Sequence, residues 1–463
     1  MLISIEHEMP AIYLKSRMGI KPQIFIDLWK ELSREGWTPD GQFGLSKEVS
    51  CAYSDAQKPY QMISTDTGPT VEIAPSPAKT IGEVDRQLKD IRAIVGTKLL
   101  QRGIGLLGSG IHPYLGNTIE EYYQYRTPRP VYDYAIKERG HQHRTLLNIA
   151  AMQEVVDVPI SEAPSIVSIM HRLTGVFLFL NRNDHEMGIA KRPYQSIRPV
   201  AWRNQMPTFG EFSSDQIKVG IPNFQVKTWK DYLRLIWDSN PMFILGTKSN
   251  GLVYIPEHPH FSHFIFSNQE WVARRLDTRE DFKIRPEMSH VRQTDWTYMG
   301  FARLRLFWKD GVSISDVATA CQSDNRTLES FLASSLEKVL IENRSSASPP
   351  PGEEMCSLAL IVGLIENFDA IKQFVNARPY KFWLKFAKQA ESWPLEKGDR
   401  DGTLSMVVDL ARTGLLKRGI DEEIYLEPIF RRLKEKLSPS EKMFNFYKDG
   451  GIDLVVEKLL YHF

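Results

Sequence analysis

The sequence has few cysteines and almost no net charge, and each of these absences excludes a class of protein. Three cysteines occur in 463 residues, and they form no CxxC pair and no disulfide framework, so we expect a reducing compartment. Lys and Arg number 58 against 57 Asp and Glu, so neither nucleic acid nor an anionic membrane is expected as the main partner. The cysteines are Cys51, Cys321 and Cys356.

Long apolar runs are also absent. The first ten residues read MLISIEHEMP, and their two glutamates interrupt any apolar stretch of the kind a signal peptide needs. No uninterrupted apolar run approaches the roughly 20 residues of a spanning helix. Hydrophobic residues at 42% and charged residues at 25% are typical of a globular protein. We therefore expect a soluble, cytoplasmic chain with no membrane partner.

What is present is a mixture of strand and helix patterns in the first part of the chain. Alternation over Leu2–Met9 predicts a strand, and an apolar stripe from Pro22 to Gly36 predicts a helix. Residues 61–73 read as a strand region broken by Gly68-Pro69, and the capping box Thr80–Glu83 opens another helix. No glycine-rich phosphate loop of either common type occurs.

The C-terminal part has a different pattern. From about residue 314 onward the periodicity predicts almost only helices, interrupted by a Pro-rich, extended spacer at Ser345–Gly352. Mixed strands and helices followed by helices indicate an α+β fold rather than an alternating βαβ fold.

Four carboxylates occur where strands would bring them together. Glu6 and Glu8 are two residues apart on one strand and therefore point to the same side, and Asp66 and Glu72 flank the Gly68-Pro69 turn. Oxygen ligands of this kind suit Mg²⁺. The same patterns also fit a solvated acidic face and an ordinary hairpin in which Asp66 caps the turn.

A second group of polar residues lies between positions 143 and 207. Gln153 belongs to a strand candidate, and Arg198 and Arg203 follow in the segment Ser196–Arg203. Paired guanidiniums bind carboxylates or phosphates by bidentate hydrogen bonds, although basic loops are also common as plain surface charge.

The order of these motifs resembles the glutamate–cysteine ligase family. The most specific matches are Ile63–Asp66 with Val71–Ile73, and Ala411–Gly419 followed by Asp421–Glu423 and Tyr425–Pro428. The resemblance implies a glutamine-synthetase-like fold, with a curved, mainly antiparallel sheet, outer helices and a helical C-terminal third. It also implies a ligase catalytic region at 1–343 and a C-terminal helical region, packed on it, at 354–463.

The resemblance implies an ATP- and Mg²⁺-dependent ligase that joins the γ-carboxylate of glutamate to an amine, most often cysteine as in glutathione biosynthesis, through an acyl-phosphate. A ligase that uses another amine and a catalytically silent binding protein are the alternatives. By resemblance, Mg²⁺ or Mn²⁺ would be held by Glu6, Glu8, Asp66 and Glu72. Substrate-binding residues would be Gln153, Arg198, Arg203 and Arg292, and catalytic residues Arg198, Arg303 and Arg305.

One feature departs from the resembled family, which has an R…Y-I-E-x-R strand whose Glu is a metal ligand. The segment Phe301–Arg305 matches this strand with Arg303 at the Glu position. Either Glu287 replaces that ligand, or one metal site is altered, or the strand lies elsewhere in the sequence.

Overall fold

The computed structural model describes the chain except for residues 40–43, 49–59, 117, 188–193, 209, 242–243, 246–250 and 294–297. Of the cysteines, Cys51 lies outside the described residues, and Cys321 and Cys356 are free thiols.

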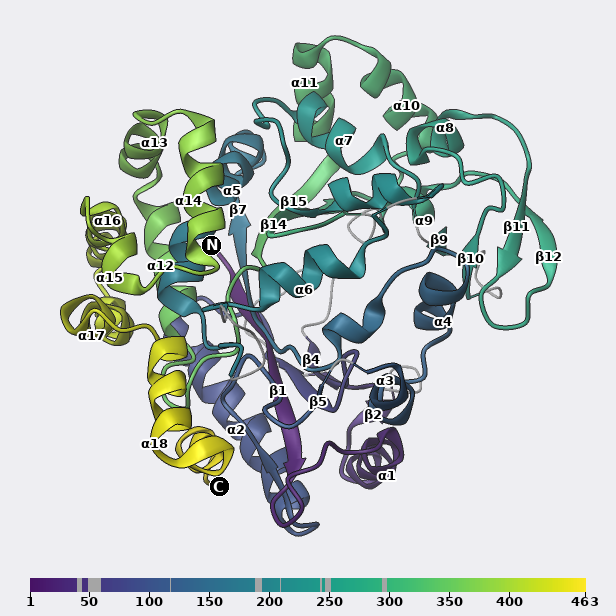
Figure 1. Cartoon of the computed structure of the whole chain (residues 1–463). Helices are drawn as coiled ribbons and strands as arrows, with labels where there is room; N and C mark the ends of the chain where they lie inside the picture. The colour runs from purple at the N-terminus through teal and green to yellow at the C-terminus, as the bar shows by residue number, and fades with distance from the viewer. Residues whose placement is uncertain are drawn as a thin grey trace.

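A long strand, β1 (Ile3–Tyr13), runs through the middle of a nine-stranded sheet in the described part of the chain (Figure 1). It pairs antiparallel with β7 (Met152–Val158) on one side and β5 (Thr70–Ala74) on the other. The order across the sheet is β14-β15-β7-β1-β5-β4-β3-β2, and β6 also pairs with β1. The other strands are β2 (Thr38–Pro39), β3 (Gly44–Glu48), β4 (Tyr60–Ser64), β6 (Ile104–Leu106), β14 (Ala302–Trp308) and β15 (Leu336–Asn343).

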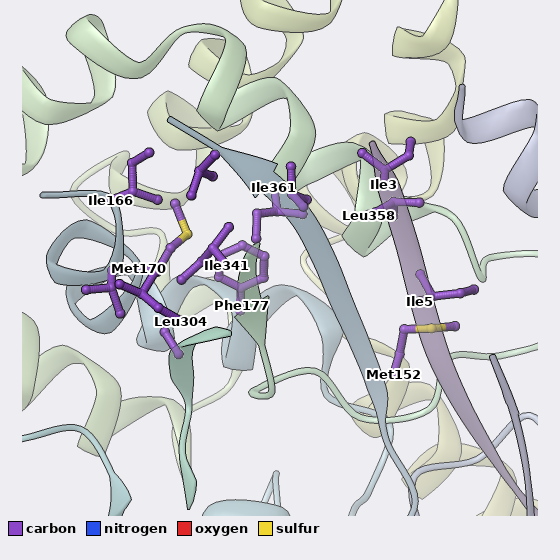
Figure 2. Close-up of a cluster of buried hydrophobic side chains, with 14 of the residues drawn as sticks. Ile3, Ile5, Met152, Ile166, Met170, Phe177, Leu304, Ile341, Leu358 and Ile361 are labelled. Atoms are coloured by element: carbon purple, nitrogen blue, oxygen red, sulfur yellow. The ribbon is translucent and has the colours of Figure 1, made fainter. Parts of the chain in front are cut away.

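One face of this sheet is apolar and covered by helices. Alternation along each strand sends every second side chain to that face. There they pack against α5 (Ala163–Asn181) and α12 (Cys356–Glu366), while α2 (Ile81–Leu100) contacts β1 and β5. Figure 2 shows the contact through Ile3, Ile5, Met152, Leu304 and Ile341 of the sheet and Ile166, Met170, Phe177, Leu358 and Ile361 of the helices. Each such buried side chain contributes about 1.5–3 kcal/mol, so this face holds the main core.

Helix α5 is long and apolar enough by composition to cross a membrane. However, 94% of its most apolar window is buried inside the protein. It also carries charged and polar residues such as His171 and Arg172 within the fold. Its apolar character is therefore accounted for by its position between the sheet and other helices.

Several local predictions are confirmed. Helix α1 (Pro22–Ser33) buries the predicted stripe, and α2 begins with the predicted capping box, in which the Thr80 side chain accepts from the Glu83 amide. The predicted strand region 61–73 forms two strands, β4 and β5, one on each side of the Gly68-Pro69 turn. The α+β class is confirmed as well, with an antiparallel main sheet and a helical C-terminal region.

One prediction about residues 336–352 was wrong. Leu336–Asn343, read as helix, forms β15 between β14 and β7. Its sequence LEKVLIEN is rich in helix formers, but Val339 and Ile341 enter the core, and this tertiary packing overrides the local propensity. The segment Ser345–Gly352 interrupts the helical region as predicted; Ser345–Ser348 are buried and Ala347 bridges to Ala151.

The C-terminal helices pack on the sheet through a close helix crossing. Gly414 of α16 (Thr403–Arg418) lies against Gly363 of α12, and a Cβ on either glycine would collide with backbone of the other helix. Gly414, within the family-like segment Ala411–Gly419, is therefore required for the close approach of the two helices. The division of the chain into 1–343 and 354–463 stays a prediction.

The remaining elements surround the sheet or form a smaller lobe between β7 and β14. Within the described residues the lobe has a four-stranded sheet, ordered β12-β11-β10-β9, and the parallel pair β8 and β13. These strands are β8 (Val219–Gly220), β9 (Ile244–Leu245), β10 (Leu252–Tyr254), β11 (Trp271–Arg275), β12 (Asp281–Ile284) and β13 (Met299–Gly300). The helices before α12 are α3 (Ile119–Tyr125), α4 (Pro130–Lys137), α6 (Arg198–Gln205), α7 (Trp229–Trp237), α8 (Phe261–Phe266), α9 (Met288–Val291), α10 (Ile314–Gln322) and α11 (Asn325–Ser335). Those after it are α13 (Phe368–Asn376), α14 (Tyr380–Ala390), α15 (Leu395–Gly398), α17 (Glu427–Glu435) and α18 (Pro439–Leu459).

Candidate functional site

The polar face of the main sheet carries a pocket of about 260 Å³, which we call the site pocket. Helix α6 lies over this face, in front of the sheet in Figure 1. The pocket collects residues far apart in the sequence: Glu6, Glu8, Asp66, Thr67, Glu72, Tyr132, Leu146, Ile149, Gln153, Arg198, Trp202, Gln205, Met299, Arg303 and Arg344. Seven of these lining residues were predicted from the sequence: Glu6, Glu8, Asp66, Glu72, Gln153, Arg198 and Arg303.

The four carboxylates are brought together by strand register. Glu8 of β1 lies directly opposite Glu72 of β5, and Glu6 points to the same side of β1. Asp66 follows β4 in the turn that leads to β5. Like charges directly opposite each other destabilise a sheet, so this arrangement favours a bound cation or a function that outweighs its cost.

Burial and mutual repulsion shift the acidity of these groups. Burial, followed by the charge of Asp66, raises the pKa of Glu8 to about 7, although Arg198 and the Ala151 amide oppose the shift. Burial raises the pKa of Glu72 well above its ordinary value, and Glu6, Glu8 and Asp66 add to the effect. These carboxylates are therefore costly to ionise together without a compensating positive charge.

Hydrogen bonds fix the orientation of Glu8. Its Oε2 accepts from the Ala151 amide at 2.7 Å, and its Oε1 accepts from Nε2 of Gln153 at 3.0 Å. Gln153 lies on β7 directly opposite Glu6. The predicted substrate residue Gln153 thus contacts a predicted metal ligand as well as the pocket.

Arginines occupy the other half of the polar face. Arg303 and Arg305 of β14 point to the same side of the strand, and Glu342 of β15 is the cross-strand partner of Arg303. The fully buried Glu342 accepts from Nε of Arg303 at 2.6 Å, from Nε of Arg305 at 2.7 Å and from an Nη of Arg344 at 2.7 Å. Burial alone would raise the pKa of Glu342, but these three guanidiniums hold it well below its ordinary value.

Arg305 joins the two halves of the site. Its second guanidinium nitrogen donates to Glu6 at 2.7 Å while its Nε donates to Glu342. Burial would lower its pKa, but Glu342 and Glu6 together raise the pKa well above the ordinary value, so it stays charged. The carboxylates of β1 and β5 and the guanidiniums of β14 and of Arg344, which follows β15, thus form adjacent zones of opposite charge on one sheet face.

Arg198 reaches the pocket from helix α6. Its backbone amide donates to Asp184 at 2.7 Å and its Nε donates to the Arg344 carbonyl at 3.0 Å, which fixes the side chain. Trp202 and Gln205 are four and seven residues further along the helix and line the same pocket. The segment predicted as a loop is therefore a short helix that places one face over the site.

Two of the predicted substrate-binding residues, Arg203 and Arg292, lie outside the site pocket among the described residues. Arg203 follows Arg198 by five positions, which turns it to another side of α6, where it pairs with Glu391 at 2.6 Å. Arg292 ends α9, where it is part exposed and contacts Asp310 at 3.4 Å. Neither residue lines the site pocket.

The departure at Arg303 is explained by a different strand. Ile341-Glu342-Asn343-Arg344 has the I-E-x-R spacing, lies on and just after β15, and precedes α12. The segment 301–305 belongs to the neighbouring β14 instead. Glu287 is exposed at the start of α9 and does not substitute for the missing carboxylate. Glu342 and Arg344 are the functional candidates that sequence reasoning missed, and the I-E-x-R spacing was the signal that could have found them.

The four carboxylates, Glu6, Glu8, Asp66 and Glu72, offer oxygen ligands of the kind that a hard divalent cation prefers. Among the described residues, no positive side chain lies within hydrogen-bond distance of Glu72. No three His, Cys, Asp or Glu side chains of the described residues form a ready-made ligand shell. Glu6 is held by Arg305 and Glu8 by Gln153, and these hydrogen bonds orient the two carboxylates.

Comparisons with known proteins bear on the fold and on the family. The fold is similar to a bifunctional glutathione synthetase from Pasteurella multocida, with a TM-score of 0.54 and 12% sequence identity over 99% of this chain. The alignment covers 52% of that protein, so the chain spans about half its length, and the likeness shows the fold alone. No curated protein sequence matches. The profile of glutamate–cysteine ligase family 2 matches residues 6–294, well over half of the sequence. This chain therefore belongs to glutamate–cysteine ligase family 2.

Proposed function

We propose that the protein is an ATP- and Mg²⁺-dependent ligase that joins the γ-carboxylate of glutamate to an amine, with cysteine as the first candidate. The observation that carries the proposal is the facing pair Glu8 and Glu72 in one pocket with Glu6, Asp66 and three arginines. Carboxylates that hold cations and guanidiniums that bind phosphate are the two parts that phosphoryl transfer needs. A cytoplasmic location accompanies the proposal and agrees with the free thiols Cys321 and Cys356.

The proposed reaction has two displacements. An oxygen of the glutamate γ-carboxylate attacks the terminal phosphorus of ATP, and ADP leaves with the electron pair of the broken P–O bond. The amine then attacks the acyl carbon of this acyl-phosphate, loses a proton, and expels inorganic phosphate. Neither step requires a nucleophilic side chain.

The residues of the pocket divide this work. Glu6, Glu8, Asp66 and Glu72 would hold Mg²⁺ or Mn²⁺, which neutralises phosphate charge when bound. Arg198, Arg303 and Arg344 would contact the transferred phosphoryl group or a substrate carboxylate, because each lines the pocket. Arg305 and Gln153 would position Glu6 and Glu8, to which they donate hydrogen bonds.

The test is substrate-dependent release of ADP and phosphate. Purified protein is incubated with MgATP and glutamate, alone and with each member of a panel of amino-acid amines. A ligase releases phosphate in proportion to a γ-glutamyl product only when both substrates are present. Turnover with another amine corrects the substrate, whereas no turnover with any pair contradicts the proposal and favours a silent binding protein.

Nucleotide and metal together are expected to stabilise the fold. A non-hydrolysable ATP analogue with Mg²⁺ at about 100 times its dissociation constant should add about 2.7 kcal/mol to the free energy of unfolding. A cation relieves the repulsion between Glu8 and Glu72, so the analogue with EDTA should stabilise much less. Thermal melting measures both, and an equal melting temperature with and without Mg²⁺ and nucleotide at saturation would contradict the metal assignment.

Arg198→Lys is expected to lower kcat/KM at least tenfold, which corresponds to about 1.4 kcal/mol of transition-state stabilisation. An ammonium cannot keep the Nε bond to the Arg344 carbonyl and also present a planar pair of donors. Arg203→Lys is the matched control on the same helix, because Arg203 pairs with Glu391 outside the pocket. If both variants retain wild-type kinetics in the ligase assay, Arg198 has no role in the reaction.

A further inference from the structure

A second polar pocket, of about 280 Å³, lies between α5, α13 and the segment that precedes α7; we call it the α5 pocket. It shares no lining residue with the site pocket. Helix α5 packs against the apolar face of the sheet (Figure 2). The site pocket opens on the polar face. The two pockets are therefore separate, and a ligand of one would not be part of the other.

The described residues that line the α5 pocket include basic side chains and no acidic ones. Arg172 of α5, Lys227 before α7 and Lys372 of α13 all line it, together with two serines and an asparagine. Among the described residues, no carboxylate forms an ion pair with any of these three cations. Asp231 is near in sequence, but its carboxylate accepts from the backbone amides of Lys227 and Thr228 as part of a helix cap. Three uncompensated cations around one cavity favour an anionic ligand.

Arg172 is the central observation. Its residue surface is only 3% exposed, and its guanidinium donates to Oδ1 of Asn376 at 2.6 Å and lies 5.7 Å from the centre of the Tyr380 ring. Its Nε has no hydrogen-bond partner among the described residues. A buried guanidinium without a carboxylate is costly, and an unsatisfied N–H adds to that cost.

The hydroxyl of Ser168 is a second buried polar group that faces the α5 pocket. Ser168 lies one helical turn before Arg172 and is 4% exposed, and its Oγ has no hydrogen-bond partner in the described part of the chain. Ser165, a further three residues back, also lines the pocket. The two hydroxyls and the guanidinium lie on one side of α5, and the two lysines face them. This set of donors and charges suits the several oxygens and double charge of a phosphate group better than it suits the single charge of a carboxylate.

We propose that the α5 pocket is a binding site for a phosphate dianion, outside the site pocket and independent of the proposed ligase activity. Arg172 and the hydroxyls of Ser165 and Ser168 would bind the phosphate oxygens, and Lys227 and Lys372 would supply the remaining positive charge. Free inorganic phosphate and the phosphate group of a small monoester share this chemistry.

The test measures anion binding by thermal melting of the full chain at constant ionic strength. Inorganic phosphate and glycerol phosphate are titrated against sodium chloride, and the dissociation constant follows from the concentration dependence of the melting temperature. We expect phosphate to stabilise the wild-type protein and the combined substitution Lys227→Gln with Lys372→Gln to weaken binding at least about tenfold. Both lysines are exposed, so this variant is expected to fold.

Controls separate this site from the site pocket. Lys15→Gln removes an exposed lysine that lines neither pocket and should leave phosphate binding unchanged. Arg172→Gln should weaken binding at least as much as the lysine pair, if it folds. If either inorganic phosphate or glycerol phosphate binds more tightly than the other, the site is supported, and the tighter ligand shows whether the pocket prefers free phosphate or a phosphate monoester. Unchanged phosphate binding in the lysine pair, or binding that disappears only in Arg198→Lys, would overturn the proposal.

Discussion

Glu342→Gln is expected to lower the free energy of unfolding by about 3–5 kcal/mol, because it removes the carboxylate shared by three guanidiniums in a buried setting. Arg303 is only 7% exposed and would lose the partner that keeps it charged there. A glutamine amide would also point a donor at one of those guanidiniums. Urea unfolding should show a lower midpoint with an unchanged slope.

Glu391→Gln is the matched control for this substitution. Glu391 is also buried and accepts from two cations, but the side chains of its partners Arg203 and Lys388 are 42% and 64% exposed. Water can solvate those cations, so the cost should be about 1 kcal/mol or less. If Glu342→Gln unfolds at the same urea concentration as Glu391→Gln, the three-arginine cluster contributes little to the fold.

Glu72→Gln should reduce ligase turnover on the order of 100-fold or more while leaving the unliganded protein at least as stable as the wild type. The substitution removes one of two carboxyl groups that lie directly opposite each other and that are costly to ionise together. It also removes a proposed metal ligand, so the stabilisation by Mg²⁺ and nucleotide should largely disappear. Opposite effects on stability and activity are the expected signature of a residue retained for function.

Glu154→Gln tests whether this signature belongs to the pocket or to any buried carboxylate. Glu154 is fully buried on β7, but it follows Gln153 and so points to the other face of the sheet, where Asn343 donates to it at 2.5 Å. Its substitution should leave the response to Mg²⁺ and nucleotide intact. A Glu72→Gln protein with wild-type turnover and a wild-type metal response would rule out Glu72 as a metal ligand.

The predicted carboxylates came together because their positions depend on local rules. Glu6 and Glu8 share a strand face by the period of two, and the Gly68-Pro69 turn returns β5 alongside β1. The registry that sets Glu8 opposite Glu72 is not local, since it follows from which side chains of β1 and β5 enter the core.

The arginines were harder to predict because guanidiniums are common on surfaces as well as in sites. Arg198 and Arg203 are close in sequence and alike in type, yet the turn of α6 separates them into a pocket residue and a surface ion pair. Arg292 had a suitable residue type but lies at an exposed helix end. Residue type alone does not distinguish these cases, because burial and direction depend on the neighbouring elements.

The sequence by itself determined the α+β order and the early strands and helices, because these depend on periodicity, capping and turn residues over short spans. Its motifs also indicated the family by resemblance, and the strand period predicted that the carboxylates would lie together. Only the tertiary structure decided that Leu336–Asn343 is a strand, that Glu342 meets Arg303, and that Arg344 enters the pocket. The physical reason is that LEKVLIEN favours helix in isolation, and the core between β14 and β7 stabilises it as a strand instead.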